Sequence, residues 1–224
     1  MNLPTFDQLA TIADKVHFAA DIGKRLLDMP KTPAEIRGYL APEEGLALMM
    51  LAEYGPGQGA VVEIGSFLGK STCWLGLDAQ SAGREKITAI DCFKPLSFMA
   101  ESEDEMDRAI VKEGYTFPFF VQHIEEFGLQ NQVEPLVGDS AKAAQAWDDR
   151  PIRLLFIDGH HEYGSVKNDF CLWSPFVQQS GIIVFHDYCA SWPGVVRYYE
   201  EMISATDQYR ELFTCYSMKI VVKC

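Results

Sequence analysis

Four acidic residues stand where short apolar runs end, and their order could bring their carboxylates together. The runs are ITAID, VEPLVG, RLLFID and GIIVFH, and the acidic residues are Asp91, Asp139, Asp158 and Asp187. If the runs are parallel strands, their carboxyl ends share the edge at which open α/β sheets bind ligands. A carboxylate there can hold ribose hydroxyls or a divalent cation. One acidic strand end is usually a turn or a helix cap, but four at one edge predict a ligand site.

A glycine loop, VVEIGSFLGKST, follows an earlier apolar run and has three interpretations. A dinucleotide-binding turn requires G-x-G-x-x-G, of which only Gly65 and Gly69 are present. A P-loop requires G-x-x-x-x-G-K-[ST], and the stretch from Gly65 to Ser71 is one residue short of it. The third pattern is the E-x-G-x-x-x-G loop of class I methyltransferases, matched by Glu63, Gly65 and Gly69. Asp91 follows at the distance at which a carboxylate can bind a ribose.

The elements that must position these residues alternate along the chain. Short apolar runs alternate with amphipathic segments, which predicts a Rossmann-like, doubly wound α/β fold with a mostly parallel seven-stranded sheet. Only Tyr216-Ser217 separates the last two runs, so we expect an antiparallel hairpin at the C-terminal edge. The expected strands are Ala60–Ile64, Lys86–Asp91, Val133–Val137, Ile152–Asp158, Gly181–His186, Leu212–Cys215 and Met218–Val222, and the expected helices between them are Lys70–Ala79, Phe117–Phe127, Ala141–Trp147 and Ser165–Val177.

Two segments lie outside this alternation. Residues 1–57 predict an N-terminal helical extension, with one helix from Thr5 to Asp28 and another from Pro42 to the Gly55-Pro56 stop. Residues 58–224 would form the ligand-binding domain. Residues 92–116, acidic in the middle and flanked by aromatics, are either a solvated excursion or a lid over the strand ends.

Composition limits the partners. A net charge of −13 over 224 residues argues against nucleic acid and anionic lipid, so a small molecule is the expected partner. No apolar run approaches the roughly 20 residues of a membrane span, and the N-terminus lacks a signal-peptide pattern. The six cysteines form no CxxC pair, which predicts reduced thiols and a cytoplasmic protein. The N-terminal helices could serve a homodimer interface or cover the acceptor site.

From about residue 41 onward the chain resembles the bacterial class I methyltransferases, in particular the Mg²⁺-dependent sugar O-methyltransferases of macrolide and aminocoumarin biosynthesis. The motifs are PEEGLALM, VVEIGSFLGKST, ITAIDCF, VEPLVGDS, LLFIDGHHEYGSVKNDF and GIIVFHDY. The resemblance implies that S-adenosylmethionine is the cofactor. It implies that the glycine loop, including Ser66, packs on the methionine part, with Glu63 near its amino group. Asp91 would hold the ribose, Asp139 and Ser140 would border the adenine, and Asp158 would also lie at the cofactor.

The same resemblance implies a metal site. Asp158 and Asp187 match its carboxylate ligands, and two carboxylates this close repel unless a cation or proton lies between them. Mg²⁺ or another divalent ion is expected, with His186 as a candidate third ligand where several relatives have a carboxylate. His161 matches the histidine of a D-x-x-H general base. His160, Glu162 and Tyr163 are expected to be loop residues, whereas Tyr188 and Trp192 either line an acceptor pocket or hold their loop.

The sequence thus predicts an S-adenosylmethionine-dependent methyltransferase, acting on the oxygen of a small hydroxylated acceptor with the help of a metal and a histidine base. Two alternatives remain at this stage. One is a cofactor-binding module without transfer activity, and the other is a Mg-dependent NTPase related to P-loop proteins. The acceptor, and even the choice between oxygen and nitrogen, is not encoded in any motif.

Overall fold

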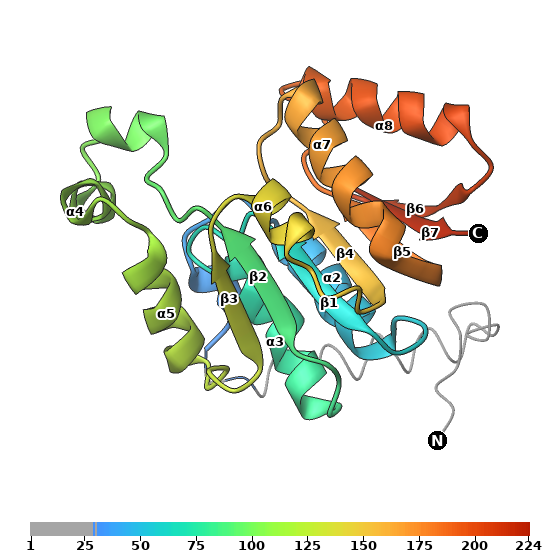
Figure 1. Ribbon diagram of the computed structural model, residues 1–224. Coiled ribbons are helices and arrows are strands. Elements are labelled where there is room, and N and C mark those ends of the chain that lie inside the picture. The colour runs from blue at the N-terminus through green and yellow to red at the C-terminus, as the bar shows by residue number, and fades with distance from the viewer. Residues whose placement is uncertain (1–28, 30) are drawn as a thin grey trace.

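The computed structural model describes residue 29 and residues 31–224, and its centre is a seven-stranded sheet (Figure 1). The order across the sheet is β3-β2-β1-β4-β5-β7-β6. The expected doubly wound α/β fold is confirmed. The strands are β1 (Ala60–Ile64), β2 (Ile87–Asp91), β3 (Val133–Val137), β4 (Ile152–Ile157), β5 (Val177–Phe185), β6 (Tyr209–Cys215) and β7 (Met218–Lys223).

The first five strands pair in parallel, and the last two complete the sheet as an antiparallel edge. β1 pairs in parallel with both β2 and β4, so the direction of winding reverses between β1 and β4. Such a reversal opens a crevice at the carboxyl ends of the strands. β7 runs antiparallel to β5 and β6, and Tyr216-Ser217 turns the chain between β6 and β7 as expected for the hairpin.

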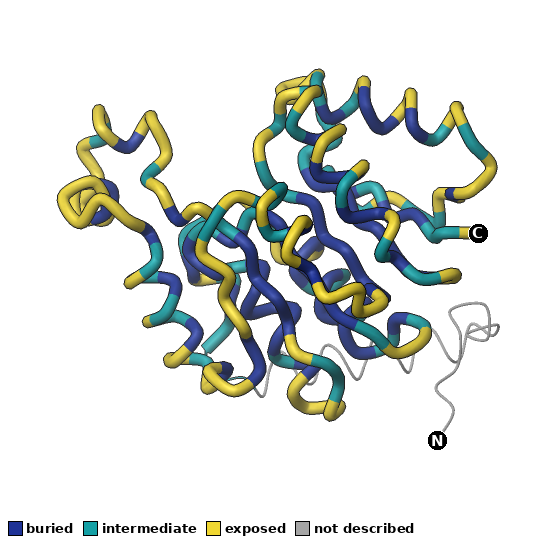
Figure 2. Tube along the Cα trace, viewed as in Figure 1, coloured by how far each residue is buried: buried dark blue, intermediate teal, exposed yellow. Residues whose placement is uncertain are grey.

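Helices cover both faces of the sheet. The helices α2 (Pro42–Tyr54), α3 (Lys70–Ser81) and α5 (Phe117–Glu126) lie on one face, and α6 (Ser140–Gln145), α7 (Tyr163–Trp173) and α8 (Pro193–Ala205) lie on the other (Figure 1). Val61 and Leu154 point to the first face, whereas Val62 and Leu155 point to the second. Both faces are therefore apolar, which is why the central strands are continuous apolar runs. Figure 2 shows the central strands buried between half-exposed helices, whereas most of the edge strand β3 is exposed.

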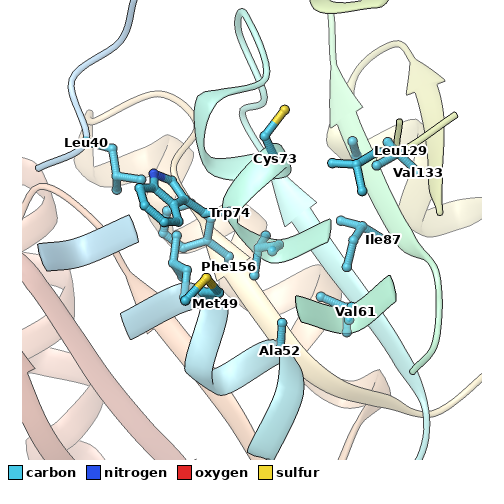
Figure 3. Close-up of a cluster of buried hydrophobic side chains, with 14 of the residues drawn as sticks. Leu40, Met49, Ala52, Val61, Cys73, Trp74, Ile87, Leu129, Val133 and Phe156 are labelled. Carbon is cyan, nitrogen blue, oxygen red and sulfur yellow. The ribbon is translucent and has the colours of Figure 1, made fainter. Parts of the chain in front are cut away.

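Trp74 of α3 is the largest side chain of the core on the α2 side (Figure 3). It packs in one cluster with Leu40, Met49 of α2 and Phe156 of β4. A Cβ on Gly45 of α2 would lie 2.3 Å from the Trp74 indole nitrogen. Glycine at this position therefore lets α2 approach α3 closely.

The C-terminal end of α2 is bound to the sheet by a buried arginine. The guanidinium of Arg153 on β4 donates hydrogen bonds to the carbonyl oxygens of Leu51 (3.2 Å) and Ala52 (2.6 Å) and to the carboxylate of Glu85 (2.8 Å). Its side chain is fully buried. The Leu51 carbonyl already accepts the N–H of Gly55 (2.9 Å). The Ala52 carbonyl, by contrast, belongs to the last turn, where carbonyls have no partner within the helix, and Arg153 supplies one. The described part of residues 1–57 thus packs into the same core as the strands.

The structure contains two helices that the sequence pattern did not predict. One is α4 (Glu105–Glu113), which follows the short 3₁₀ helix η3 (Ser97–Glu101) inside the excursion of residues 92–116. The other is α8, which begins at Pro193 and buries Val195, Tyr198, Tyr199 and Met202. Pro193-Gly194 is typical of a turn, but proline is also favoured in the first turn of a helix. Two further 3₁₀ helices are η2 (Pro33–Glu35) and η4 (Ser174–Phe176).

The structure describes only part of the segment for which the sequence predicts N-terminal helices. The helix predicted from Thr5 to Asp28 lies outside the described residues, and the division of the chain at residue 57 stays a prediction. Among the helices that the structure does describe, none combines the length and the apolar character needed to cross a membrane.

Candidate active site

The carboxyl ends of the central strands lie side by side, joined by backbone hydrogen bonds beyond the strands themselves. The N–H of Gly65 donates to Ile90 (2.9 Å), and that of Asp158 donates to Ile64 (2.8 Å). The N–H of His186 donates to Ile157 (3.1 Å). The end of β1, the end of β4 and the end of β5 therefore keep their alignment where the sequence places its polar residues.

The glycine loop is shaped by its own backbone contacts. Gly65 has φ +91°, and a Cβ there would lie 2.0 Å from the carbonyl oxygen of Asp158. Gly69, which precedes α3, has φ +86°. Both positions require glycine for local reasons, since side chains rarely adopt such a φ.

Asp91 at the end of β2 holds this loop in place. One carboxylate oxygen accepts the backbone N–H of Ser66 (2.9 Å) and of Phe67 (2.7 Å), and the other accepts the N–H of Phe93 (2.6 Å). The predicted ribose ligand is thus also the residue that orders the loop. The residue is only half-buried.

Glu63 is fully buried beneath the loop and only partly satisfied. One carboxylate oxygen accepts hydrogen bonds from the hydroxyls of Ser66 (2.8 Å) and Thr72. The other oxygen has no hydrogen-bond partner among the described residues. Burial raises the pKa of Glu63 to about 7, although the hydroxyls of Ser71, Thr72 and Ser66 act to lower it. A cationic group placed beside that oxygen would compensate the buried charge.

Asp139 and Ser140 have structural partners at the start of α6. The Asp139 carboxylate caps the helix by accepting the N–H groups of Ala141 (3.1 Å) and Lys142 (3.2 Å). The Ser140 hydroxyl donates to Asp169 of α7. These contacts fit the helix-cap interpretation of Asp139 and do not reach the glycine loop. Their predicted place beside the adenine stays a prediction.

Asp158, His161 and Asp187 form a compact cluster beyond β4 and β5. The Nε2 atom of His161 lies 2.8 Å from an oxygen of Asp187 and 3.9 Å from an oxygen of Asp158. One potential ligand atom from each residue lies within 4.8 Å of the other two. All three side chains are partly exposed, so the cluster can be reached from solvent. Two carboxylates and an imidazole are a donor set that suits a divalent cation.

The charges within the cluster shift one another's pKa values. Burial alone would lower the pKa of His161, but hydrogen bonds and charge from Asp158 and Asp187 raise it to about 9. Burial acts to raise the pKa of Asp187, yet the two histidines outweigh it and hold that pKa well below its usual range. Asp187 adopts φ +59°, a left-handed conformation uncommon for a residue other than glycine. Such strain is often found at functional sites.

His186 lies behind the two aspartates instead of at the mouth of the site. Its Nδ1 atom is 2.9 Å from Asp158 and 3.4 Å from Asp187, and its Nε2 atom is 3.1 Å from Glu44. Its side chain is only 1% exposed. Both ring nitrogens thus have carboxylate partners. The three residues whose potential ligand atoms lie close enough together to hold a metal ion are Asp158, His161 and Asp187. The predicted ligand role of His186 would require it to leave one of these partners.

Glu44 is the residue of the site that sequence reasoning missed. The motif PEEG shows Glu44 only as an acidic residue in the first turn of a helix. In the structure it is 2% exposed and contacts His186, which is 142 positions away in the sequence. Burial acts to raise its pKa, but His186, Ala41 and Ser217 outweigh that and lower it. In the sequence, the one available signal was helix amphipathicity, which would place Glu43 on the exposed face of α2 and Glu44 on its buried face.

The aromatic residues near the site divide into two groups. The Trp192 ring lies 4.2 Å from the His161 ring, centroid to centroid, and is 42% exposed. Trp192 therefore borders the mouth of the site. The Tyr188 hydroxyl donates instead to Glu200 of α8, and the Lys219 ammonium lies over its ring.

The three residues expected in the loop have outward or structural positions. His160 is exposed, and Glu162 is the residue that precedes the first turn of α7. Tyr163 begins α7 and donates its hydroxyl to Glu201 (2.5 Å) of α8. None of these contacts reaches the cluster.

The excursion of residues 92–116 is attached to the core. Phe93, Met99 and Ile110 are buried in the cluster that also contains α2 and α3. Arg37 forms ion pairs with Asp104 (2.6 Å) and Asp107 (2.7 Å), which ties the excursion to the segment before α2. In Figures 1 and 2 the excursion projects from the body of the molecule with a largely exposed surface. The lid interpretation stays a prediction.

Comparison with known proteins identifies the domain. The methyltransferase-domain family matches residues 62–188, more than half of the chain, a range that contains the glycine loop and both clustered aspartates.

The chain belongs to this family. One curated relative is the uncharacterized protein R132 of Acanthamoeba polyphaga mimivirus, which is 34% identical over 127 residues. The match covers 57% of this chain and 50% of that protein, so the chain spans about half the length of the curated relative.

Solved structures share the fold at low sequence identity. The O-methyltransferase NovP has a TM-score of 0.64 and 14% identity, covering 93% of this chain and 98% of its own. The O-methyltransferase TomG of Streptomyces achromogenes, in complex with S-adenosylmethionine, has a TM-score of 0.57 and 17% identity, covering 93% and 94%. An rRNA methylase from Streptococcus thermophilus has a TM-score of 0.52 and 13% identity, covering 83% and 99%.

The expected resemblance to class I methyltransferases is therefore confirmed. Residues 62–188 form a methyltransferase domain. The acceptor is a separate matter, because one fold carries both O-methyltransferases and an rRNA methylase.

Proposed function

We propose that this protein transfers the methyl group of S-adenosylmethionine to a hydroxyl oxygen of a small acceptor, with a divalent metal and His161 as the base. The observation that carries the proposal is the cluster of Asp158, His161 and Asp187 beside the glycine loop. A module that only binds the cofactor has no need of an imidazole among carboxylates at this edge.

The methyl donor would lie along the glycine loop. The unpaired oxygen of Glu63 supports this assignment, since the ammonium group of the methionine part would compensate its buried charge. Asp91 stands at the end of β2, where its carboxylate can accept hydrogen bonds from ribose hydroxyls. In this assignment Asp91 serves two purposes, because it also holds the N–H groups of Ser66 and Phe67.

The metal would be held by Asp158 and Asp187. A divalent ion supplies a Lewis acid that lowers the pKa of a bound hydroxyl. The two carboxylates fit this purpose, because both lie close to the same two histidines, His161 and His186. Mg²⁺ suits the carboxylates, and a softer divalent ion would be favoured if His161 became a third ligand.

His161, whose pKa of about 9 keeps it protonated in the absence of a cation, would lose that proton when the metal binds and would then accept the proton of the acceptor hydroxyl. Methyl transfer from a sulfonium is a direct displacement, so the site needs alignment of the two reactants and a place for the proton. His161 faces Asp187 with Nε2 and can turn from that oxygen toward an acceptor once a cation neutralises the carboxylate. Trp192 covers one side of the imidazole and restricts the direction from which an acceptor can approach.

The acceptor would be small and neither a nucleic acid nor a membrane lipid. The net charge of −13 opposes binding to a phosphate backbone, in spite of the shared fold with an rRNA methylase. A cytoplasmic location is part of the proposal, since all six cysteines are free thiols. A homodimer through the N-terminal segment also stays a proposal.

The NTPase alternative is disfavoured by a specific contact. In a phosphate-binding loop the backbone N–H groups point toward the phosphate. Here the N–H groups of Ser66 and Phe67 point to the carboxylate of Asp91, whose charge would repel a phosphate.

Isothermal titration with S-adenosylhomocysteine and with ATP tests the donor, and methyl transfer from labelled S-adenosylmethionine to a panel of phenols and sugars tests the reaction. We expect micromolar binding of S-adenosylhomocysteine, no binding of ATP, and turnover that a chelator abolishes. Full turnover after chelation would contradict the metal part. Tight cofactor binding without transfer to any hydroxylated acceptor would favour the non-catalytic module.

A further inference from the structure

A buried chain of charged contacts runs from α2 to the two aspartates of the site. Glu44 contacts Nε2 of His186 at 3.1 Å, and Nδ1 of His186 contacts Asp158 at 2.9 Å. The Glu44 and His186 side chains are 3% and 1% exposed. Charged groups at this depth are costly unless they are paired, so each of these two depends on the other.

Glu44 is itself held by three separate parts of the chain. One carboxylate oxygen accepts the backbone N–H of Ala41 (2.9 Å) as well as the histidine contact. The other oxygen accepts the N–H (2.9 Å) and the hydroxyl (2.8 Å) of Ser217, in the turn between β6 and β7. With four donors around it, the carboxylate has little freedom to move.

His186 transmits this fixed position to the site. Its two nitrogens are held in one rigid ring and point in diverging directions, so a carboxylate that fixes Nε2 also fixes the direction of Nδ1. That nitrogen lies between Asp158 and Asp187, at 2.9 Å and 3.4 Å. Groups that hold metal ligands by hydrogen bonds orient those ligands and tune metal affinity.

We propose that Glu44 is a positioning residue for the metal site, acting through His186 to hold Asp158 and Asp187 in the orientation that binds a divalent cation. The inference rests on the metal part of the proposed function. It assigns a role to α2 in the chemistry of a site formed by β4 and β5, although α2 contributes no atom to the cation cluster.

The test is the affinity for Mn²⁺ in the Glu44→Gln variant, measured by titration calorimetry and by electron paramagnetic resonance. Glutamine keeps the size of the side chain and removes its charge. The matched control is Glu43→Gln, because Glu43 is its exposed neighbour and its carboxylate accepts a hydrogen bond from the hydroxyl of the exposed Tyr216. We expect Mn²⁺ affinity to fall about 10- to 100-fold in Glu44→Gln and to remain unchanged in Glu43→Gln.

Two further measurements separate positioning from general damage. The predicted site for S-adenosylhomocysteine contains neither Glu44 nor His186 and shares only Asp158 with the metal site, so its affinity should weaken far less than the affinity for Mn²⁺. His186→Asn should weaken Mn²⁺ binding to a similar extent, and the double variant should lose little more, because the two residues act in series.

Ser217→Ala serves if Glu44→Gln does not fold. It removes one donor to Glu44 and keeps the backbone N–H, so a smaller loss of roughly two- to fivefold in Mn²⁺ affinity is expected. Wild-type affinity in a folded Glu44→Gln or in Ser217→Ala would overturn the positioning role alone. A wild-type protein that binds no Mn²⁺ would overturn the metal part of the proposed function and this inference with it.

Discussion

The Nε2 atom of His161 lies 2.8 Å from an oxygen of Asp187, although the two residues follow different strands. The contact places an imidazole against a carboxylate that is already next to a second histidine, His186. The cluster is therefore balanced between two negative and two potentially positive side chains. Any cation that enters it must compete with the histidines, which makes both metal affinity and catalysis sensitive to pH.

Replacing His161 tests whether it is the base. We expect His161→Ala to lower turnover by roughly 10²- to 10⁴-fold, the usual contribution of a general base. His160→Ala is the matched control. Because the His160 side chain is exposed, we expect the His160→Ala enzyme to have normal turnover. Mn²⁺ affinity distinguishes a general base from a metal ligand. If His161 is only the base, the His161→Ala variant should still bind Mn²⁺, whereas loss of a metal ligand should weaken Mn²⁺ binding. Normal turnover in His161→Ala would exclude both roles.

The pH dependence of metal binding follows from the raised pKa of His161. With that pKa at about 9, the imidazole is protonated at neutral pH, and its charge opposes a cation at Asp158 and Asp187. Mn²⁺ affinity should therefore rise as pH increases toward 9, by at most about tenfold per unit for each proton displaced. Calorimetry in two buffers of different ionisation enthalpy measures the released proton. The same affinity from pH 6.5 to pH 9 would contradict this expectation.

Asp91 should matter for both cofactor binding and the glycine loop. Asp91→Ala removes the acceptor of three backbone N–H groups, so we expect affinity for S-adenosylhomocysteine to weaken by about 1–3 kcal/mol, with a comparable loss of stability. Titration calorimetry and chemical unfolding measure the two effects separately. The comparison is Asp139→Asn, which keeps a helix-capping side chain and so should preserve stability. Unchanged cofactor affinity in Asp91→Ala would remove that residue from the site.

Because burial raises the pKa of Glu63, we expect the free energy of unfolding to depend on pH. Its pKa in the folded protein, about 7, lies above the ordinary value of 4.5, so folding favours the protonated form. The stabilisation is complete below pH 4.5 and is lost as pH rises through 7, by up to about 3 kcal/mol. Glutamine at position 63 cannot ionise. Between pH 5 and pH 8 the original protein should therefore lose stability relative to the Glu63→Gln variant. Urea unfolding at both values in the absence of cofactor checks this. A difference that does not change with pH would mean that Glu63 is ionised throughout.

Much of the architecture was predictable because it depends on local patterns. Apolar runs such as Ile152–Ile157 are buried on both faces, and their alternation with helices predicts a parallel sheet. The short interval at Tyr216-Ser217 allowed only an antiparallel hairpin. Helix α8 escaped prediction because its first residues, Pro193-Gly194, are common in turns, and only packing against β5 and β7 distinguishes the two conformations.

The candidate site divides in the same way between sequence and tertiary structure. The sequence by itself determined that Asp91, Asp158 and Asp187 would meet at one edge, because parallel strands bring their carboxyl ends together. It also placed His161 close to Asp158, three residues away. Only the tertiary structure decided that His186 turns inward to Glu44, which is 142 positions away, and that His161 takes the place beside Asp187. The order of residue types along the strands predicts which side chains share an edge of the sheet. The direction of each side chain depends instead on its partners from other elements. Packing and the need to pair buried charges determine those partners.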